Sequence, residues 1–99
     1  MRILPAKEEL VKAIAIGLGV DPPRMSTGST EPKAIFLLVN EVLGLRLSTK
    51  LTKPELARCI VELSGSTWLT TAESRGGTVT AEGLNQVLKA VEFFTSQGP

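Results

Sequence analysis

The sequence predicts a mainly α-helical single domain built from four helices. In four separate stretches, apolar residues recur at spacings of three and four, which places them on one face of a helix. A threonine with a proline or an acidic residue in the turn that follows it precedes three of these stretches, as is typical of helix starts. With 99 residues, 42% hydrophobic and 21% charged, the chain can bury one modest core.

The first helix is expected from Leu4 to about Leu18, ending near Gly17 or Gly19. Its buried face is predicted to comprise Leu10, Val11, Ile14 and Leu18. The next segment, Asp21 to Thr30, combines helix breakers with small polar residues, so we expect a flexible loop there. A second interpretation makes this loop a boundary that leaves the first helix loosely attached. No Walker pattern is present to support a phosphate-binding loop.

Thr30 is predicted to cap a second helix over Glu31–Gly44, the most hydrophobic part of the chain. Its apolar stripe comprises Ile35, Leu38, Val39, Val42 and Leu43, widened by Phe36 and Leu37. Asn40 interrupts the stripe and is expected on the solvent side, with a buried polar residue that gives specificity as the alternative. In the connector that follows, Leu45, Leu47 and Leu51 should pack inward, and the polar residues between them should face water.

The third helix, from Lys53 to about Ser64, has the clearest start. Thr52 and Glu55 have the spacing of a capping box, in which each side chain accepts a hydrogen bond from the other residue's backbone N–H. Leu51 and Leu56 are spaced for a hydrophobic staple across this cap. The buried face is predicted to comprise Leu56, Ile60 and Leu63, with Cys59 beside them as a buried thiol.

Residues 66–80 are rich in threonine and valine, and two interpretations remain open: a small β-hairpin with Glu73 to Gly77 at its tip, or an irregular loop anchored by Trp68. Trp68 is expected in the core, with its indole N–H bonded to a backbone acceptor. Thr80 should cap the last helix, with Val79 and Leu84 as a staple. The inward face of that helix is predicted to be Leu84, Val87, Leu88, Val91 and either Phe93 or Phe94. The whole chain, 1–99, is thus one domain with a first helix (1–20), a loop (21–30) and a helical core (31–96).

Several classes of site are excluded by residue type. The single cysteine and the absence of histidine rule out an internal disulfide, a Cys/His zinc site and a histidine-activated nucleophile. Adjacent carboxylates occur only as Glu8-Glu9, on a helix surface. We therefore expect no enzyme activity, no cofactor and no metal. Because the start of the chain lacks a signal-peptide pattern and no apolar run approaches about 20 residues, we expect a cytoplasmic protein that does not enter membranes.

The net charge is only +1, but the stretch from Arg46 to Arg58 carries four cations and one acid, a local charge of +3. The positive end of a helix, with lysines and hydroxyls beside it, favours binding of a phosphate group. An arginine flanked by glycines in the following loop could reach a DNA backbone or minor groove. We therefore predict contact with double-stranded DNA through Arg46, Lys50, Thr52, Lys53, Arg58 and Arg75.

Two family resemblances agree with this prediction. The stretch from Val42-Leu43-Gly44-Leu45 to Thr52-Lys53-Pro54-Glu55-Leu56-Ala57-Arg58 resembles the helix–extended loop–helix of SAP-type DNA-binding modules, in which Gly-Leu ends one helix and Thr-Lys-x-Glu-Leu opens the next. The run from Leu51 to Val91, with Ser74-Arg75-Gly76-Gly77, resembles accessory DNA-recognition domains of prokaryotic restriction endonucleases. These resemblances imply a helix-turn-helix-like DNA-binding role in a restriction system, with cleavage supplied by another domain.

The alternative function is a helical protein–protein interaction or dimerisation module. The hydrophobicity of Ala34–Leu45 can exceed what a chain of 99 residues needs to bury. An apolar patch left exposed in this way would bind a protein partner or a second copy of the chain.

Overall fold

The computed structural model describes residues 6–22 and 33–97, and within them the predicted mainly α-helical fold is confirmed. Its elements are four α-helices and one short 3₁₀ helix: α1 Lys7–Leu18, α2 Lys33–Leu43, α3 Lys53–Leu63, η1 Thr70–Ala72 and α4 Ala81–Ser96. The predicted cap at Thr30, the start at Leu4 and most of the loop to Thr30 lie outside the described residues.

The helix starts at Thr52 and Thr80 form as predicted. The Thr52 hydroxyl accepts from the Glu55 N–H, and the Glu55 carboxylate accepts from the Thr52 N–H at 3.0 Å, which closes the capping box. The Thr80 hydroxyl accepts from the Gly83 N–H at 3.2 Å. These bonds satisfy backbone donors that the first turn of a helix cannot satisfy itself.

Three helices stop in the same way. Gly19, Gly44 and Gly65 each adopt a positive φ, and the residue after each glycine donates its N–H to a carbonyl five residues earlier. This is the Schellman arrangement, which favours glycine because a side chain is strained in the left-handed region. The glycine therefore turns the chain sharply out of each helix.

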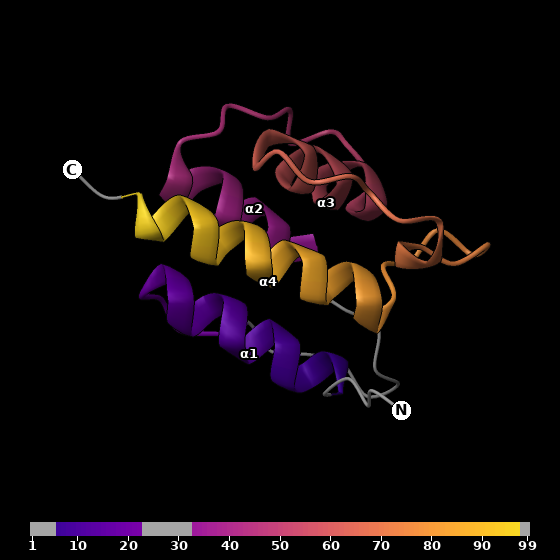
Figure 1. Ribbon diagram of the computed structural model, residues 1–99, viewed down its shortest axis with the longest axis horizontal. Coiled ribbons are helices and arrows are strands. Elements are labelled where there is room, and N and C mark those ends of the chain that lie inside the picture. The colour runs from indigo at the N-terminus through magenta and orange to yellow at the C-terminus, as the bar shows by residue number, and fades with distance from the viewer. Residues whose placement is uncertain (1–5, 23–32, 98–99) are drawn as a thin grey trace.

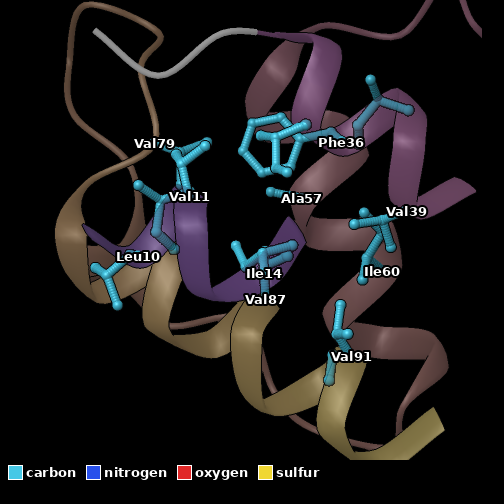
Figure 2. Close-up of a cluster of buried hydrophobic side chains, with 14 of the residues drawn as sticks. Leu10, Val11, Ile14, Phe36, Val39, Ala57, Ile60, Val79, Val87 and Val91 are labelled. Carbon is cyan, nitrogen blue, oxygen red and sulfur yellow. The ribbon is translucent and has the colours of Figure 1, made fainter. Parts of the chain in front are cut away.

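All four α-helices contribute to one core. Helix α4 lies across the middle of the molecule in Figure 1, contacting α1 on one side and α3 on the other, and α2 contacts α1 and α3. The largest fully buried side chains, several of which Figure 2 labels, are Phe36, Leu10, Ile14, Ile35, Leu56, Ile60, Leu84, Val11, Val39, Val61 and Val79. Since Leu10, Val11 and Ile14 belong to this cluster, α1 is an integral part of the core and is not loosely attached.

The helices run in broadly the same direction. In α2 and α3, Phe36 lies near Ala57 and Val39 lies beside Ile60, so the residue numbers rise together along the pair (Figure 2). In α1 and α4 the same order holds, because a Cβ on Gly17, late in α1, would lie 3.3 Å from the Val91 side chain, late in α4. Figure 1 likewise shows α4 and α2 ending on the same side of the molecule. The starts of the helices therefore gather at one end, the amino end, and their last turns at the other, the carboxyl end.

Helices that run the same way need long returns between them, and residues 44–52 form one. Near the end of α2, the Asn40 side chain donates to the Leu47 carbonyl at 3.1 Å and accepts from the Leu47 N–H at 2.8 Å. At the start of α2, the Lys33 ammonium donates to the Thr49 carbonyl at 2.9 Å. The return thus runs back along α2. Asn40, which we expected on the solvent side, is instead partly buried because it holds this segment.

Residues 64–80 form the second return. The Gln86 side chain of α4 donates to the Thr67 carbonyl at 2.8 Å and accepts from the Leu69 N–H at 3.2 Å. After η1, a single antiparallel bridge pairs Glu73 with Val79, and none of the described residues forms a β-strand. The structure is closer to the irregular loop than to the hairpin.

Other predictions in α3 and the second return need correction. Leu63 is exposed because its turn extends past the buried seam, and Cys59 is half-buried rather than fully enclosed. Trp68 packs against the core but is only half-buried, and its indole N–H donates to the Glu73 carboxylate at 3.0 Å and not to a backbone acceptor. In α4 the prediction of either Phe93 or Phe94 on the inward face is confirmed, because Phe94 packs against the core and Phe93 is exposed.

Candidate nucleic-acid interface

The first return presents its polar side chains in the predicted alternation. Leu45 and Leu47 are half-buried against the core, whereas the residues between and after them are exposed: Arg46, Ser48, Thr49 and Lys50. Among the described residues, Arg46 is the one non-glycine with a positive φ, 62°. This backbone conformation turns the chain between two inward-facing leucines and directs the arginine to solvent.

The amino end of α3 differs from the bare helix start that the sequence suggested. Pro54 has no N–H, and the Glu55 N–H is already bonded to Thr52. The Glu55 carboxylate also accepts from the Thr52 hydroxyl, and these two Thr52 bonds, helped by Arg58, lower the pKa of Glu55. An anion at this end would therefore meet the Glu55 carboxylate beside the lysines, and not a row of bare amides.

The six predicted contact residues do not form one cluster. Lys50, Thr52 and Lys53 come together where the first return meets α3, with Lys50 exposed and Lys53 half-buried. Arg46 lies at the far end of the return, beside the end of α2. Arg58 is five residues beyond Lys53, a rotation of roughly 140° around the helix, so the two cations point to different sides.

Arg58 is also partly neutralised. Its guanidinium lies 4.0 Å from the Glu62 carboxylate, one turn further along α3, and both side chains are about half exposed. An exposed pair of this kind is weak, typically below about 1 kcal/mol. Arg58 is nevertheless a poorer phosphate contact than Lys50, because a carboxylate stands beside it.

Arg75 lies on the loop between Glu73 and Val79. The loop is closed by hydrogen bonds between Ser74 and Thr78, whose backbone N–H and carbonyl are 2.9 Å apart. Figure 1 shows this loop next to the start of α4, at the amino end of the molecule. The exposed Arg75 thus lies at the same end as Lys50 and Lys53.

Three acids near the amino end accept hydrogen bonds from neighbouring side chains, although Glu55 and Glu73 remain exposed. Glu73 accepts from the Trp68 indole, Glu82 accepts from the Thr71 hydroxyl, and Glu55 is held by Thr52. Within residues 6–22 and 33–97, neither Lys50 nor Arg75 makes an ion pair. Lys50 and Arg75 are thus exposed at an end that also carries the exposed acids Glu8 and Glu9 in the first turn of α1.

The described part of the chain offers little support for other chemistry. It contains no group of three or more histidine, cysteine, aspartate or glutamate side chains that could hold a metal ion. None of its helices has both the length and the apolar character required to cross a bilayer. Cys59 has no histidine to activate it, because the sequence has none.

The second prediction, an exposed apolar patch within Ala34–Leu45, is met only in part. Ile35, Phe36 and Val39 are fully buried, so most of that stripe belongs to the core. Val42 is 44% exposed. Leu63, which sequence reasoning placed in the core, is exposed as well, and so is Phe93, one of the two alternatives for the inward face of α4.

The first return, packed against α2, therefore exposes cations beside the acids of the amino end, and the carboxyl end exposes apolar side chains where the core stops. Comparison of the chain with protein-family models, with curated proteins and with solved structures finds no match.

Proposed function

We propose that this chain is a non-catalytic DNA-binding module that contacts the phosphate backbone with its first return and the start of α3. The observation that carries the proposal is the fixed alternation of residues 44–52. The leucines are held inward by the core and by Asn40, and Arg46, Ser48, Thr49 and Lys50 are held outward. Because the backbone that carries these side chains is held in place, less conformational freedom is lost on binding than with a flexible tail.

The chemistry of this surface suits phosphate. Lysine and arginine attract the phosphate charge and release its counterions, and serine and threonine hydroxyls add hydrogen bonds without sequence preference. The local charge of +3 between Arg46 and Arg58 supplies the attraction that the net charge of +1 does not. Binding should therefore be weakly sequence-specific and strongly dependent on salt.

The arrangement of α2 and α3 also supports the proposal. A helix, an extended segment and a second capped helix follow one another, as the resemblance to SAP-type modules implies. It is not a helix-turn-helix, in which three or four residues join two helices at a steep angle. The resemblance to accessory domains of restriction endonucleases adds that any cleavage would come from another domain.

The residues differ in their expected contributions. Lys50 and Lys53 contribute most because they lie together at the start of α3. Arg46 and Arg75 extend the surface on either side, and the Thr52 hydroxyl is already used by Glu55. Arg58 contributes least because it points elsewhere and pairs with Glu62.

The test measures binding of a charge-reversed variant to duplex DNA by fluorescence anisotropy at low salt. Lys50→Glu combined with Lys53→Glu should abolish measurable binding. The matched control is Lys12→Glu with Lys89→Glu, which changes the net charge equally on exposed faces of α1 and α4. The control should bind nearly as well as the wild type.

Two outcomes would end the proposal: no binding by the wild-type chain, or equal losses in the two charge-reversed variants. The second outcome would mean that DNA responds only to net charge. Raising the salt concentration should weaken wild-type binding steeply, because each phosphate contact releases a counterion. A flat salt response would argue against phosphate contacts.

A further inference from the structure

The hydrophobic core is open at the carboxyl end of the bundle. Val39 and Ile60 are fully buried where α2 meets α3 (Figure 2). One turn further along the same seam lie Val42 and Leu63, each three residues on, and they are 44% and 53% exposed. The apolar faces of α2 and α3 therefore extend past the point at which the rest of the protein buries them.

Helix α4 adds aromatic surface at the same level. Val91 is buried, and Phe94, three residues later, is half-buried against the core. Phe93 is 42% exposed and meets Phe94 edge to face, with ring centroids 5.6 Å apart. We call Val42, Leu63, Phe93 and Phe94 the open-end patch.

The charges around the open-end patch are unevenly placed. Glu41, Glu62 and Glu92 are exposed and directly precede three of its members. The last turns of α2, α3 and α4 contain no basic residue, so no cation within those turns offsets the negative ends of the helix dipoles.

Three cations lie nearby but outside the last turns. Arg58 pairs with Glu62 from one turn back, and Lys89 lies one turn before Phe93 on α4. Arg46 follows the end of α2 on the first return. The outermost charged side chain on each of the three helices is thus an acid.

This charge pattern discriminates between possible occupants. A second copy of the chain, docked through the same patch by two-fold symmetry, would bring glutamates against glutamates and carboxyl ends against carboxyl ends. An apolar helix face flanked by lysine or arginine would satisfy both the apolar side chains and the acids. We propose that the open-end patch binds a cationic amphipathic helix of a partner protein, independently of the DNA-binding surface.

The test uses a labelled synthetic helix of about 18 residues, long enough to be helical, with leucine on one face and lysine on the other. A matched peptide carries glutamate in place of lysine. Binding of each to the full chain is followed by fluorescence anisotropy at about 0.1 M salt, where surface charges still act within about 10 Å. The lysine peptide should bind, and the glutamate peptide should bind at least about tenfold more weakly.

Variants locate the binding. Leu63→Ser or Phe93→Ser should weaken the lysine peptide by about tenfold or more, as expected for losing one buried apolar side chain. Leu69→Ser is the matched control, because Leu69 is 46% exposed but lies in the second return, outside the patch. Glu41→Gln with Glu62→Gln should weaken binding of the lysine peptide while leaving the apolar surface intact. All these side chains are exposed, so the variants should fold.

The proposal is overturned if neither peptide binds, if both bind equally, or if Leu69→Ser is as damaging as Leu63→Ser. It is also overturned if sedimentation shows a dimer that Leu63→Ser dissociates, since the occupant would then be a second copy. The proposal for the open-end patch and the DNA-binding proposal can be refuted independently. Leu63→Ser should not affect DNA binding, and Lys50→Glu with Lys53→Glu should not affect peptide binding.

Discussion

Two return segments lie wholly within the described residues, 44–52 and 64–80. Both connect helices that run in the same direction, but different contacts hold them in place. Each leaves a helix at the carboxyl end and carries the chain back to the amino end. Each is held by one amide side chain that both donates and accepts, Asn40 for the first and Gln86 for the second. Asn40 is partly buried in its bonds, whereas the bonds of Gln86 are exposed.

The second return has further supports of its own. It contains the 3₁₀ turn, the bridge between Glu73 and Val79, and the Thr80 hydroxyl bonded to the Thr71 carbonyl at 2.7 Å. It also presses on α4 at Gly83, where there is no room for a side chain. The first return is thus held by side-chain contacts with its helix, and the second by backbone bonds and a close approach to glycine.

The largest expected effect is at that close approach. In Gly83→Ala, the new Cβ would overlap the Ala72 carbonyl and lie 2.6 Å from the Val79 side chain. We expect a loss of about 2 kcal/mol in the free energy of unfolding, since strain from overpacking exceeds the helix preference of alanine. This corresponds to a fall in Tm of about 10 °C, measurable by circular dichroism.

Gly17→Ala is the control for this prediction. Its Cβ would lie 3.3 Å from Val91, a contact that a small shift relieves, so its stability should stay within about 1 kcal/mol of the wild type. If Gly83→Ala were as stable as Gly17→Ala, the second return would not press on α4 as described.

The next prediction compares the stability lost when each of the two amide side chains, Asn40 and Gln86, is removed. Asn40→Ala leaves the Leu47 N–H and carbonyl without partners in a partly buried place, and should lower the unfolding free energy by about 2 kcal/mol. Gln86→Ala exposes its partners to water and should lower it by at most about 1 kcal/mol. Urea denaturation of both variants measures the difference. Equal losses would contradict the contrast between a buried and an exposed contact.

A smaller effect, of opposite sign, is expected at Arg46. Its φ of 62° is strained for a residue with a Cβ, so Arg46→Gly should raise the unfolding free energy by about 0.5–1 kcal/mol. Arg46→Ala keeps the strain and removes the charge. If both variants lose DNA affinity while only the glycine variant gains stability, Arg46 serves binding at the expense of stability. A glycine variant less stable than the wild type would exclude strain at this position.

The smallest effect is the pH dependence of the cap that ends the first return. Hydrogen bonds from the Thr52 N–H and hydroxyl lower the pKa of Glu55 below its ordinary value of 4.5. Because the pKa is lower in the folded chain, the stabilisation is complete above the ordinary value and is lost as the pH falls through the lowered value. Thermal unfolding from pH 7 to pH 3 should show this loss in the wild type. In Glu55→Gln, this part of the pH dependence should be absent.

Much of the fold was predictable because local rules determine it. The caps at Thr52 and Thr80 and the glycine stops at Gly19 and Gly44 all depend on neighbours in the sequence. The common direction of the helices was not predictable, because it depends on how far residues 44–52 travel before α3 begins. The role of Asn40 was not predictable for the same reason, because its partner Leu47 comes close to it only after the chain has turned back along α2.

The candidate sites show the same limit. Periodicity correctly separates the inward leucines of the first return from its exposed polar residues. It cannot show that Glu55 competes with a phosphate for the start of α3, or that Arg58 faces away from Lys53. Periodicity also places Leu63 and Val42 on the apolar faces of their helices. It cannot show that these two residues lie beyond the buried core, because exposure depends on where the neighbouring helices stop.

The common direction of the helices has a consequence for folding. Antiparallel bundles can assemble from neighbouring hairpins, but here α1 packs along α4, the last helix of the chain. Such long-range contacts close late and slow the search for the native state. During synthesis, the part of α1 that packs along α4 would stay uncovered until α4 had left the ribosome, whereas α2 could cover its share earlier.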